Sequence, residues 1–194
     1  MTSGQSRRMR WLTNVVGFDD APFAHAHRGD VRLVGTVCAR TRLDGVLSGR
    51  VRRDGTNAAR AMIALVTESQ FAHHVRAVLL QGIAVAGFNV VDVHALAKGL
   101  GVPVLVVMRR RPDLVAMRAA IARIPGGAAK WARIEAAGPI EHAGKVLVQR
   151  VGLSLDEARA LLEATTLHGH LPEPLRLAHL IAGGVTTGTS RGRA

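Results

Sequence analysis

The sequence predicts an α/β fold with a central mixed sheet flanked by helices. Short Val-rich segments that alternate apolar and polar residues fill the first part of the chain, and such segments are typical of antiparallel strands. Continuous apolar runs follow them, as expected of strands buried on both faces, and alternate with segments of helical periodicity. The chain has 194 residues, which suffices for one domain with a sizeable core.

Three strands are predicted in the N-terminal part, over residues 14–19, 31–39 and 43–51. A turn at residues 40–42 separates the second strand from the third, so the three form an antiparallel meander. The only cysteine, Cys38, lies in the apolar run of the second strand, which excludes a disulfide within the chain. We expect it to be a buried, inert thiol.

The middle of the chain predicts a helix followed by a β-α-β unit. The elements cover residues 56–69 (helix), 75–80 (strand), 88–100 (helix) and 104–107 (strand). Gly101 ends the second helix. A crossover helix between two strands of one sheet requires those strands to run parallel. We therefore expect a buried parallel pair away from the sheet edges.

The C-terminal part predicts three helices and one strand, over residues 113–124, 145–149 (strand), 154–166 and 172–182. Asp113 stands at the N-cap position of the first of these helices. Ser154 and Glu157 form a capping box at the start of the second. Pro172 or Pro174 opens the last one. A strand meander followed by alternating strands and helices is the element order of a ribonuclease H-like α/β domain.

The composition favours a polyanionic partner. The chain has 26 Lys and Arg against 14 Asp and Glu, a net charge of +12 and a pI near 11.6. A basic balance of this size suits nucleic-acid binding. An Arg-rich genome would produce the same bias, because Arg and Ala are abundant throughout and the densest basic run is only residues 109–111.

The ends of the chain are expected to be flexible tails, at residues 1–13 and 188–194, around a single domain at 14–187. The longest apolar stretch, residues 77–91, is interrupted by polar side chains and is shorter than the ~20 residues that cross a membrane. No signal peptide is expected, since an apolar core segment and a cleavage site are missing. These features predict a cytoplasmic protein with no membrane partner, and they leave its oligomeric state open.

Carboxylates at strand ends are the first candidates for chemistry. A nuclease of the predicted fold needs carboxylates that converge and hold Mg²⁺, which activates water and stabilises the leaving oxygen. Asp19 and Asp20 end the first strand, Asp54 follows the third, and Asp92 lies beyond the fourth. The structural alternatives are turns for Asp19 and for Asp54, and a helix-start role for Asp92.

Histidines and the last helix supply further candidates. Arg176 and His179 are three residues apart, so they project from the same side of the last predicted helix, either as a docking feature or as part of a site. His25 and His27 would share one face of a strand, but a zinc site is not expected without further Cys or His partners. If the chain has a catalytic histidine, the loop residues His168 and His170 are the best candidates.

Long motifs give the chain a family resemblance: GFDDAPF at 17–23, DGTNAA at 54–59, LLQGIAVAGFNVVD at 79–92, VPVLVVMRR at 102–110 and PEPLRLAHLIA at 172–182. Their order and spacing resemble the endonuclease dU family, a distant relative of endonuclease V. The resemblance implies a ribonuclease H-like fold and a Mg²⁺-dependent nuclease, with Mn²⁺ as a possible substitute. The implied substrate is nucleic acid that contains deaminated bases.

The likeness to endonuclease V also implies roles for individual residues. Asp19 and Asp54 match two catalytic, metal-binding carboxylates. Gln81 stands where a third Asp is expected, so it can offer an oxygen to the cation but no charge. Arg109 matches a phosphate-contacting Lys. A histidine expected near residues 151–152 is missing, and so is the Tyr of a strand-separating wedge expected near residues 43–47.

The same likeness suggests where a base and its phosphate would lie. Phe88 and Asn89 are candidates for a base pocket, although Phe88 equally suits the core. Gly82 and Gly87 permit close approach of a base or phosphate, or they simply meet the needs of a turn. Asp92 is a candidate substitute ligand for the cation.

Three functions fit these features. The first is a Mg²⁺-dependent endonuclease for deaminated DNA or RNA. The second is a relative that recognises modified bases in nucleic acid without cleaving it, as the departures at Gln81 and near residue 151 would allow. The third is a small-molecule or interaction protein on the same fold, since a fold does not settle function.

Overall fold

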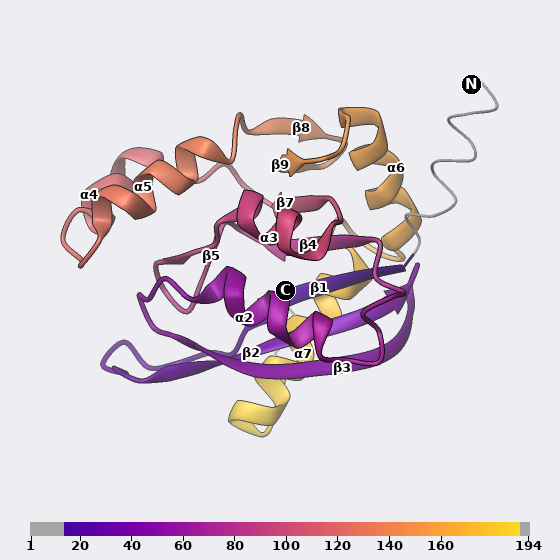
Figure 1. The fold of residues 1–194 in the computed structure, drawn as a ribbon, viewed down its shortest axis with the longest axis horizontal. Coiled ribbons are helices and arrows are strands. Elements are labelled where there is room, and N and C mark those ends of the chain that lie inside the picture. The colour runs from indigo at the N-terminus through magenta and orange to yellow at the C-terminus, as the bar shows by residue number, and fades with distance from the viewer. Residues whose placement is uncertain (1–13, 191–194) are drawn as a thin grey trace.

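A seven-stranded mixed sheet collects strands from almost the whole of residues 14–190, which the computed structural model describes (Figure 1). The strand order is β3-β2-β1-β4-β7-β9-β8. The strands are β1 (Asn14–Asp20), β2 (Asp30–Ala39), β3 (Arg42–Arg52), β4 (Ala77–Gln81), β7 (Val104–Met108), β8 (Glu141–Ala143) and β9 (Val146–Val151).

The predicted topology is confirmed. Strands β1, β2 and β3 pair as an antiparallel meander, while β4 pairs in parallel with both β1 and β7. Strand β9 is antiparallel to β7, so the sheet is mixed. The interior strand β4 is buried except at its last residue, Gln81. The C-terminal ends of β1, β4 and β7 therefore meet at one edge of the sheet.

Helices cover both faces of the sheet. They are α2 (Ala58–Thr67), α3 (Val93–Leu100), α4 (Leu114–Ile121), α5 (Gly127–Ala136), α6 (Leu155–Thr165) and α7 (Glu173–Thr187). Helices α2 and α3 pack on the larger apolar cluster, whereas α6 and the first turn of α7 pack on the cluster of the opposite face. Helices α4 and α5 lie beside one another at one end of the molecule (Figure 1).

The caps predicted from the sequence are present. The Asp113 side chain accepts the Ala116 N–H at the start of α4, and Ser154 and Glu157 form the capping box of α6. Cys38 is fully buried, as expected, and burial raises the pKa of its thiol to about 11.

The predicted helix over residues 88–100 is wrong in its first turn. Residues 84–90 form a small hairpin of β5 (Ala84–Val85) and β6 (Asn89–Val90), and the helix begins only at Val93. Asp92 caps it, because its carboxylate accepts the Ala95 N–H at 2.9 Å. The apolar residues of 84–91 are buried by the hairpin and not by a helical stripe.

Besides strand β5 of the hairpin, two further elements lie where no element was predicted, helix α5 and the short strand β8. Helix α4 ends at Ile121, earlier than the Pro-Gly-Gly segment at residues 125–127 that was expected to end it, and Gly126 and Gly127 instead begin α5. At the C-terminus, the expected tails at 1–13 and 191–194 lie outside the described residues, whereas residues 188–190 follow α7 directly and Thr187 donates to the Thr189 carbonyl. Within residues 14–190, none of the helices has the length and apolar character that crossing a membrane requires.

Candidate active site at the end of β1 and β4

A cavity of about 720 Å³ opens where the parallel strands β1 and β4 end. Asp19, Asp20 and Phe23 line it from β1 and the segment that follows, and Gln81 lines it from β4. The last three turns of α7 close the other side with His179 and Thr187. Open α/β sheets place their ligands outside the carboxyl ends of their strands, so this position is where a substrate site is expected.

The approach of α7 to the sheet depends on Gly17. A Cβ atom on Gly17 would lie 2.6 Å from the backbone of Pro174, which is closer than any real contact. Strand β2 contributes Thr36, whose hydroxyl donates to the Pro174 carbonyl. The helix therefore starts directly on β1 and β2, and its continuation brings His179 to the end of β1.

Asp19 and His179 form a hydrogen-bonded pair. His179 Nδ1 lies 2.8 Å from Asp19 Oδ2, across 160 residues of sequence. Asp19 is buried, and a third of the His179 side chain is exposed to the cavity. The hydrogen bond to Asp19 raises the pKa of His179, with the charges of Asp19 and Asp20 adding to the effect, while burial and the charge of Arg109 oppose it. The imidazole is thereby fixed at the carboxylates, and its protonated form is favoured.

Asp20, beside this pair, ionises late. Burial and then the charge of Asp19 raise the pKa of Asp20 to about 6, although hydrogen bonds from the backbone of Ala86 and of Asp20 itself act in the opposite direction. Ala86 has a left-handed φ of 49° and belongs to the β5–β6 turn. The cavity therefore holds two adjacent carboxyl groups, of which one is easily protonated.

Gln81 presents a buried oxygen with no partner. Its Oε1 atom accepts no hydrogen bond from the described residues. A buried acceptor left unsatisfied costs on the order of 1–3 kcal/mol, and native proteins rarely tolerate it without a ligand, an ion or water. Because Gln81 lines the same cavity as Asp19 and Asp20, the oxygen-rich side of the cavity is suited to a hard cation.

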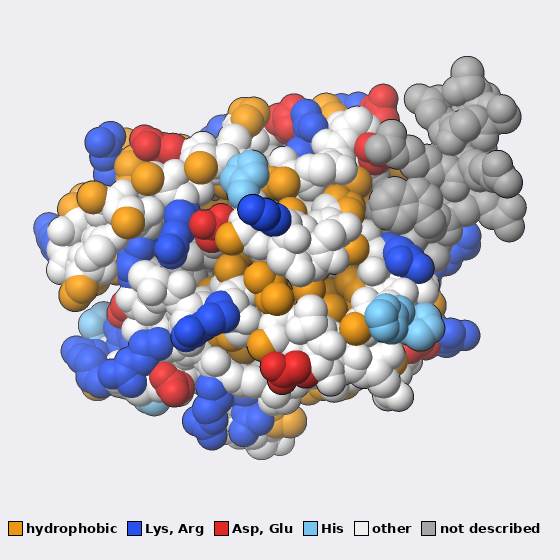
Figure 2. Space-filling view, viewed as in Figure 1, with side chains coloured by type: hydrophobic (Ala, Val, Ile, Leu, Met, Phe, Trp, Pro, Cys, Tyr) orange, Lys and Arg blue, Asp and Glu red, His pale blue; other side chains and the backbone are white. Residues whose placement is uncertain are grey.

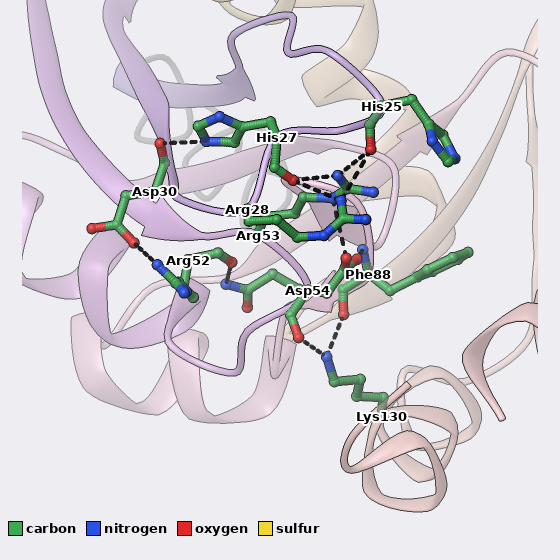
Figure 3. Close-up of polar contacts among 10 residues, drawn as sticks. His25, His27, Arg28, Asp30, Arg52, Arg53, Asp54, Phe88 and Lys130 are labelled. Carbon is green, nitrogen blue, oxygen red and sulfur yellow. Dashed lines mark hydrogen bonds and ion pairs between the residues drawn. The ribbon is translucent and has the colours of Figure 1, made fainter. Parts of the chain in front are cut away.

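The second predicted carboxylate, Asp54, is engaged in a different cluster (Figure 3). Its Oδ1 accepts the Phe88 N–H at 2.8 Å, and its Oδ2 lies 3.2 Å from Arg53 Nε, an ion pair without hydrogen-bond alignment. The fully buried Lys130 of α5 donates from Nζ to the carbonyl oxygens of Asp54 and Phe88. Asp54 is not among the residues that line the cavity, so the structure does not bring it into one cavity with Asp19.

The Asp54 cluster instead supports a wall of the cavity. Figure 3 shows Arg53 reaching from Asp54 toward the carbonyls of His25 and His27, and its guanidinium donates to both. The same guanidinium lies 5.4 Å from the ring centre of Phe23, a cavity-lining residue. Asp54 also has a left-handed φ of 51°, a conformation that non-glycine residues adopt mainly where the surroundings impose it.

Several predicted contact residues have structural roles. Asn89 is fully buried: its amide oxygen accepts the Ala58 N–H, and its amide nitrogen donates to the Arg52 carbonyl and to Asn57. The Arg176 guanidinium binds the Glu173 carboxylate through two nitrogens. Asn89, Arg176 and the capping residue Asp92 thus have partners within the protein, and their contact with nucleic acid or metal stays a prediction.

The two glycines and the phenylalanine that were predicted to make room for a base lie in different places, at the cavity and at the Asp54 cluster. Gly82 has a left-handed φ of 83°, and a Cβ there would face open space beside Gln81. Gly87 is needed by the Asp54 cluster, because a Cβ would lie 2.5 Å from Asp54 Oδ1. Phe88 is half-buried and packs against the core. Of these residues, Gly82 leaves the most room for a ligand.

The remaining predicted residues lie at defined places. Arg109 is exposed at the end of β7, and its charge acts on His179. His170 lines a separate cavity beside α6, so His179 and not His168 or His170 supplies the imidazole at the carboxylates. Sequence reasoning missed Phe23, Arg53 and Lys130. Lys130 carried no usable signal, because a buried lysine looks like a surface residue in a hydrophobicity pattern.

Comparison with known proteins shows which family and which proteins this chain resembles. The family model described as endonuclease dU matches residues 12–186. A UPF0215 protein of Deinococcus radiodurans is 55% identical over 183 residues, covering 94% of this chain and 93% of the relative.

Solved structures give the same picture. A protein of unknown function from Archaeoglobus fulgidus superposes with a TM-score of 0.83 at 31% identity, covering 89% of this chain and 97% of that one. Ciona intestinalis endonuclease V, solved with a 24mer DNA containing an inosine followed by a ribo-adenosine, gives a TM-score of 0.54 at 13% identity, covering 90% and 92%. The ribonuclease H-like fold predicted from the element order is therefore confirmed.

Proposed function

We propose that this chain, which belongs to the endonuclease dU family, is a metal-dependent nuclease. Its substrate would be nucleic acid that contains deaminated bases. One observation carries the proposal. The cavity at the end of β1 and β4 joins the Asp19–His179 pair, the easily protonated Asp20 and the unpartnered oxygen of Gln81. Such a set can bind a cation and move protons.

The donor atoms of the cavity fit a divalent cation of the Mg²⁺ type. Among residues 14–190, no group of three or more His, Cys, Asp or Glu side chains could hold a metal ion, so the carboxylates need the amide oxygen of Gln81. Asp19, Asp20 and Gln81 would hold Mg²⁺ or Mn²⁺, which both accept oxygen ligands. When bound, the ion would activate water and stabilise charge on the phosphate.

The protein's own groups supply positioning and proton transfer. The hydrogen bond to Asp19 fixes the His179 ring and leaves Nε2 as the nitrogen available to a substrate. Because its pKa is raised, His179 retains a proton closer to neutral pH, which suits it to protonate the leaving oxygen of a phosphodiester. The charge of Arg109 reaches His179, which supports a contact between its guanidinium and the same phosphate.

The preference for deaminated bases draws support from relatives. The inosine-containing DNA bound to the Ciona endonuclease V shows that a protein of this fold accepts such a strand. The open space at Gly82, next to Gln81, offers room for a strand to approach the cavity. The net charge of +12 favours a polyanion in general.

A cleavage assay tests the proposal. Oligonucleotides that contain deoxyuridine or deoxyinosine, in single- and double-stranded form, are incubated with Mg²⁺, Mn²⁺ or EDTA. We expect cleavage that needs the metal and exceeds that of undamaged DNA. Asp19→Asn removes a cation ligand and the partner of His179, so it should lower the rate at least about 100-fold, the low end of the contribution of positioned acid–base groups.

The matched control is Asp44→Asn, which removes an exposed carboxylate paired with Arg42 on β3. This variant should retain the wild-type rate. Metal-dependent cleavage by Asp19→Asn at the wild-type rate would refute the proposed site.

The second candidate function is recognition of modified bases in nucleic acid without cleavage. Gln81 favours it, because an amide in place of a carboxylate removes one negative charge from the set that would hold the cation. Tight binding of a deaminated oligonucleotide without cleavage in either metal would identify this second function.

A further inference from the structure

A second cavity, of about 380 Å³, adjoins the candidate active site. The two cavities share Ala21, Pro22 and Phe23, so one strand of ligand can pass from one to the other over this segment. The far side of the second cavity is formed by Arg32 of β2 and Arg50 of β3. Its chemistry is therefore dominated by two guanidinium groups.

Arg32 and Arg50 are directly opposite each other in the β2–β3 ladder. Like charges at such positions destabilise a sheet, because their side chains lie close together on one face. Neither side chain forms an ion pair with a carboxylate within residues 14–190, and Arg32 donates only to the Ser48 hydroxyl. An anion between the two would remove the repulsion.

The neighbouring pair on the same strands shows the contrast. Asp30 is opposite Arg52 in the ladder, and the two side chains form an ion pair of 3.7 Å. Asp30 also lines the second cavity and is its single acidic lining residue among the described ones. Its charge is thus balanced by Arg52, and the positive charge of Arg32 and Arg50 remains for a ligand.

The end of helix α7 leaves this pair accessible. Side chains alternate between the faces of a strand, so Arg32 shares a face with Val34 and Thr36. Helix α7 covers Thr36 with its first turn and Val34 with its middle, whereas its last turn, at Val185 and Thr186, borders the cavity beside Arg32. The basic pair therefore faces the same side of the sheet as His179.

We propose that Arg32 and Arg50 bind one backbone phosphate of the nucleic-acid strand whose scissile phosphate lies in the candidate active site. The inference rests on the proposed function and extends it by assigning a second, non-reacting phosphate site. The planar fork of each guanidinium suits phosphate oxygens. Contact with the backbone positions a strand without reading its bases, so this site serves every substrate sequence.

The test is the salt dependence of binding to a deoxyinosine oligonucleotide in EDTA, where no cleavage interferes. Loss of one phosphate contact should reduce the slope of log K against log salt by about 0.7 for a single strand. We expect the full reduction for the Arg32→Ala/Arg50→Ala double variant and a part of it for each single variant, because both residues hold the same phosphate and one of them can retain it. Arg42→Ala, at the other end of β3 and paired with Asp44, is the control for bulk charge.

The outcomes separate this inference from the proposed function. A wild-type slope in the double variant, with cleavage intact, would overturn the second phosphate site alone. Failure of the wild-type protein to bind or cleave any oligonucleotide would overturn both. Folding is checked separately: since each replacement removes a like-charge contact, the melting temperature without nucleic acid should stay equal or rise.

Discussion

At the scale of single residues, the cavity is built from groups whose chemistry depends on their neighbours. Asp19 is buried at a strand end and would be an ordinary turn residue without His179, which comes from the other end of the chain. The family resemblance puts Gln81 where a carboxylate is expected, and the structure adds that its side-chain oxygen is buried without a partner among the described residues. Asp20 differs again, because its ionisation opposes folding.

Asp20→Asn should stabilise the metal-free protein at neutral pH. With a folded-state pKa of about 6 against 3.8, Asp20 is protonated in both states below pH 3.8. Between these values the unfolded chain loses the proton while the folded protein keeps it, so stability falls as pH rises and the penalty is complete above about pH 6. The variant escapes a penalty of up to about 3 kcal/mol, at ~1.4 kcal/mol per pKa unit.

Chemical denaturation in EDTA between pH 3.5 and 7.5 measures this effect. The stability difference between variant and wild type should be near zero at the acidic end and grow toward neutral pH. A difference that does not change with pH would show that Asp20 ionises normally in the folded protein.

Gln81→Asp should strengthen cation binding by restoring a charged ligand. An added carboxylate raises the affinity of an oxygen site for a divalent cation, and a gain of about tenfold or more is expected. Isothermal titration with Mn²⁺ measures it. In EDTA the same variant should be less stable than the wild type, since a third carboxylate would join Asp19 and Asp20 without compensation.

At the scale of elements, the strands followed from the sequence, whereas the hairpin β5–β6 and helix α5 did not. Strand β3 alternates exposed and buried residues in part, whereas β1 and β2 are buried along almost their whole length and were predicted from their apolar, Val-rich sequences. Helix α5 buries Gly127, Lys130 and Ile134, so its inward face contains one apolar side chain of ordinary size and gives no hydrophobic stripe. Lys130 is buried and donates to the carbonyl oxygens of Asp54 and Phe88, which are distant in the sequence, so no local pattern predicts its burial.

The candidate site was predictable to a similar extent. Asp19 could be located because strand ends meet at one edge of a sheet, and Gln81 was located by the likeness to endonuclease V; both line the cavity. The same reasoning placed Asp54 with them. The left-handed turn at Asp54 directs its carboxylate to the Phe88 N–H and to Arg53. A turn conformation of this kind is set by contacts with residues 34 positions away, which no local pattern records.

Gly17→Ala should separate helix α7 from the sheet. The new Cβ would meet the Pro174 backbone at 2.6 Å, and backbone cannot rotate away as a side chain does. Overpacking of this kind destabilises by about 1–3 kcal/mol, and we expect the upper part of that range. Because α7 carries His179, the shift should also weaken the Asp19–His179 hydrogen bond.

Two measurements check the Gly17 prediction. Thermal unfolding reports the stability, and NMR titration of the histidine rings reports the His179 pKa, which should move down toward its ordinary value of 6.5. Gly184→Ala is the control, since a Cβ on this α7 glycine meets no atom within 4 Å. An unchanged His179 pKa in Gly17→Ala would mean that the contact with Pro174 does not position the pair.

At the scale of the whole molecule, the two cavities share the segment that follows β1, and positive charge gathers near this segment. Figure 2 shows Lys and Arg side chains gathered at the lower left, where Figure 1 places the segment between β1 and β2. The net charge of +12 attracts a polyanion from a distance, and the cavities then determine where its backbone lies. Long-range attraction and local positioning are thus separate properties of different residues.

The outer strand β3 has a consequence for how copies of the protein behave toward each other. It is an 11-residue sheet edge with partly exposed Leu43 and Val46, and unpaired edges of this length template aggregation. The charges of Arg42, Asp44 and Arg50 along it oppose edge-to-edge pairing. Arg50 would then protect the dissolved protein as well as hold a phosphate, so a chain that lost this arginine would lose colloidal stability together with affinity.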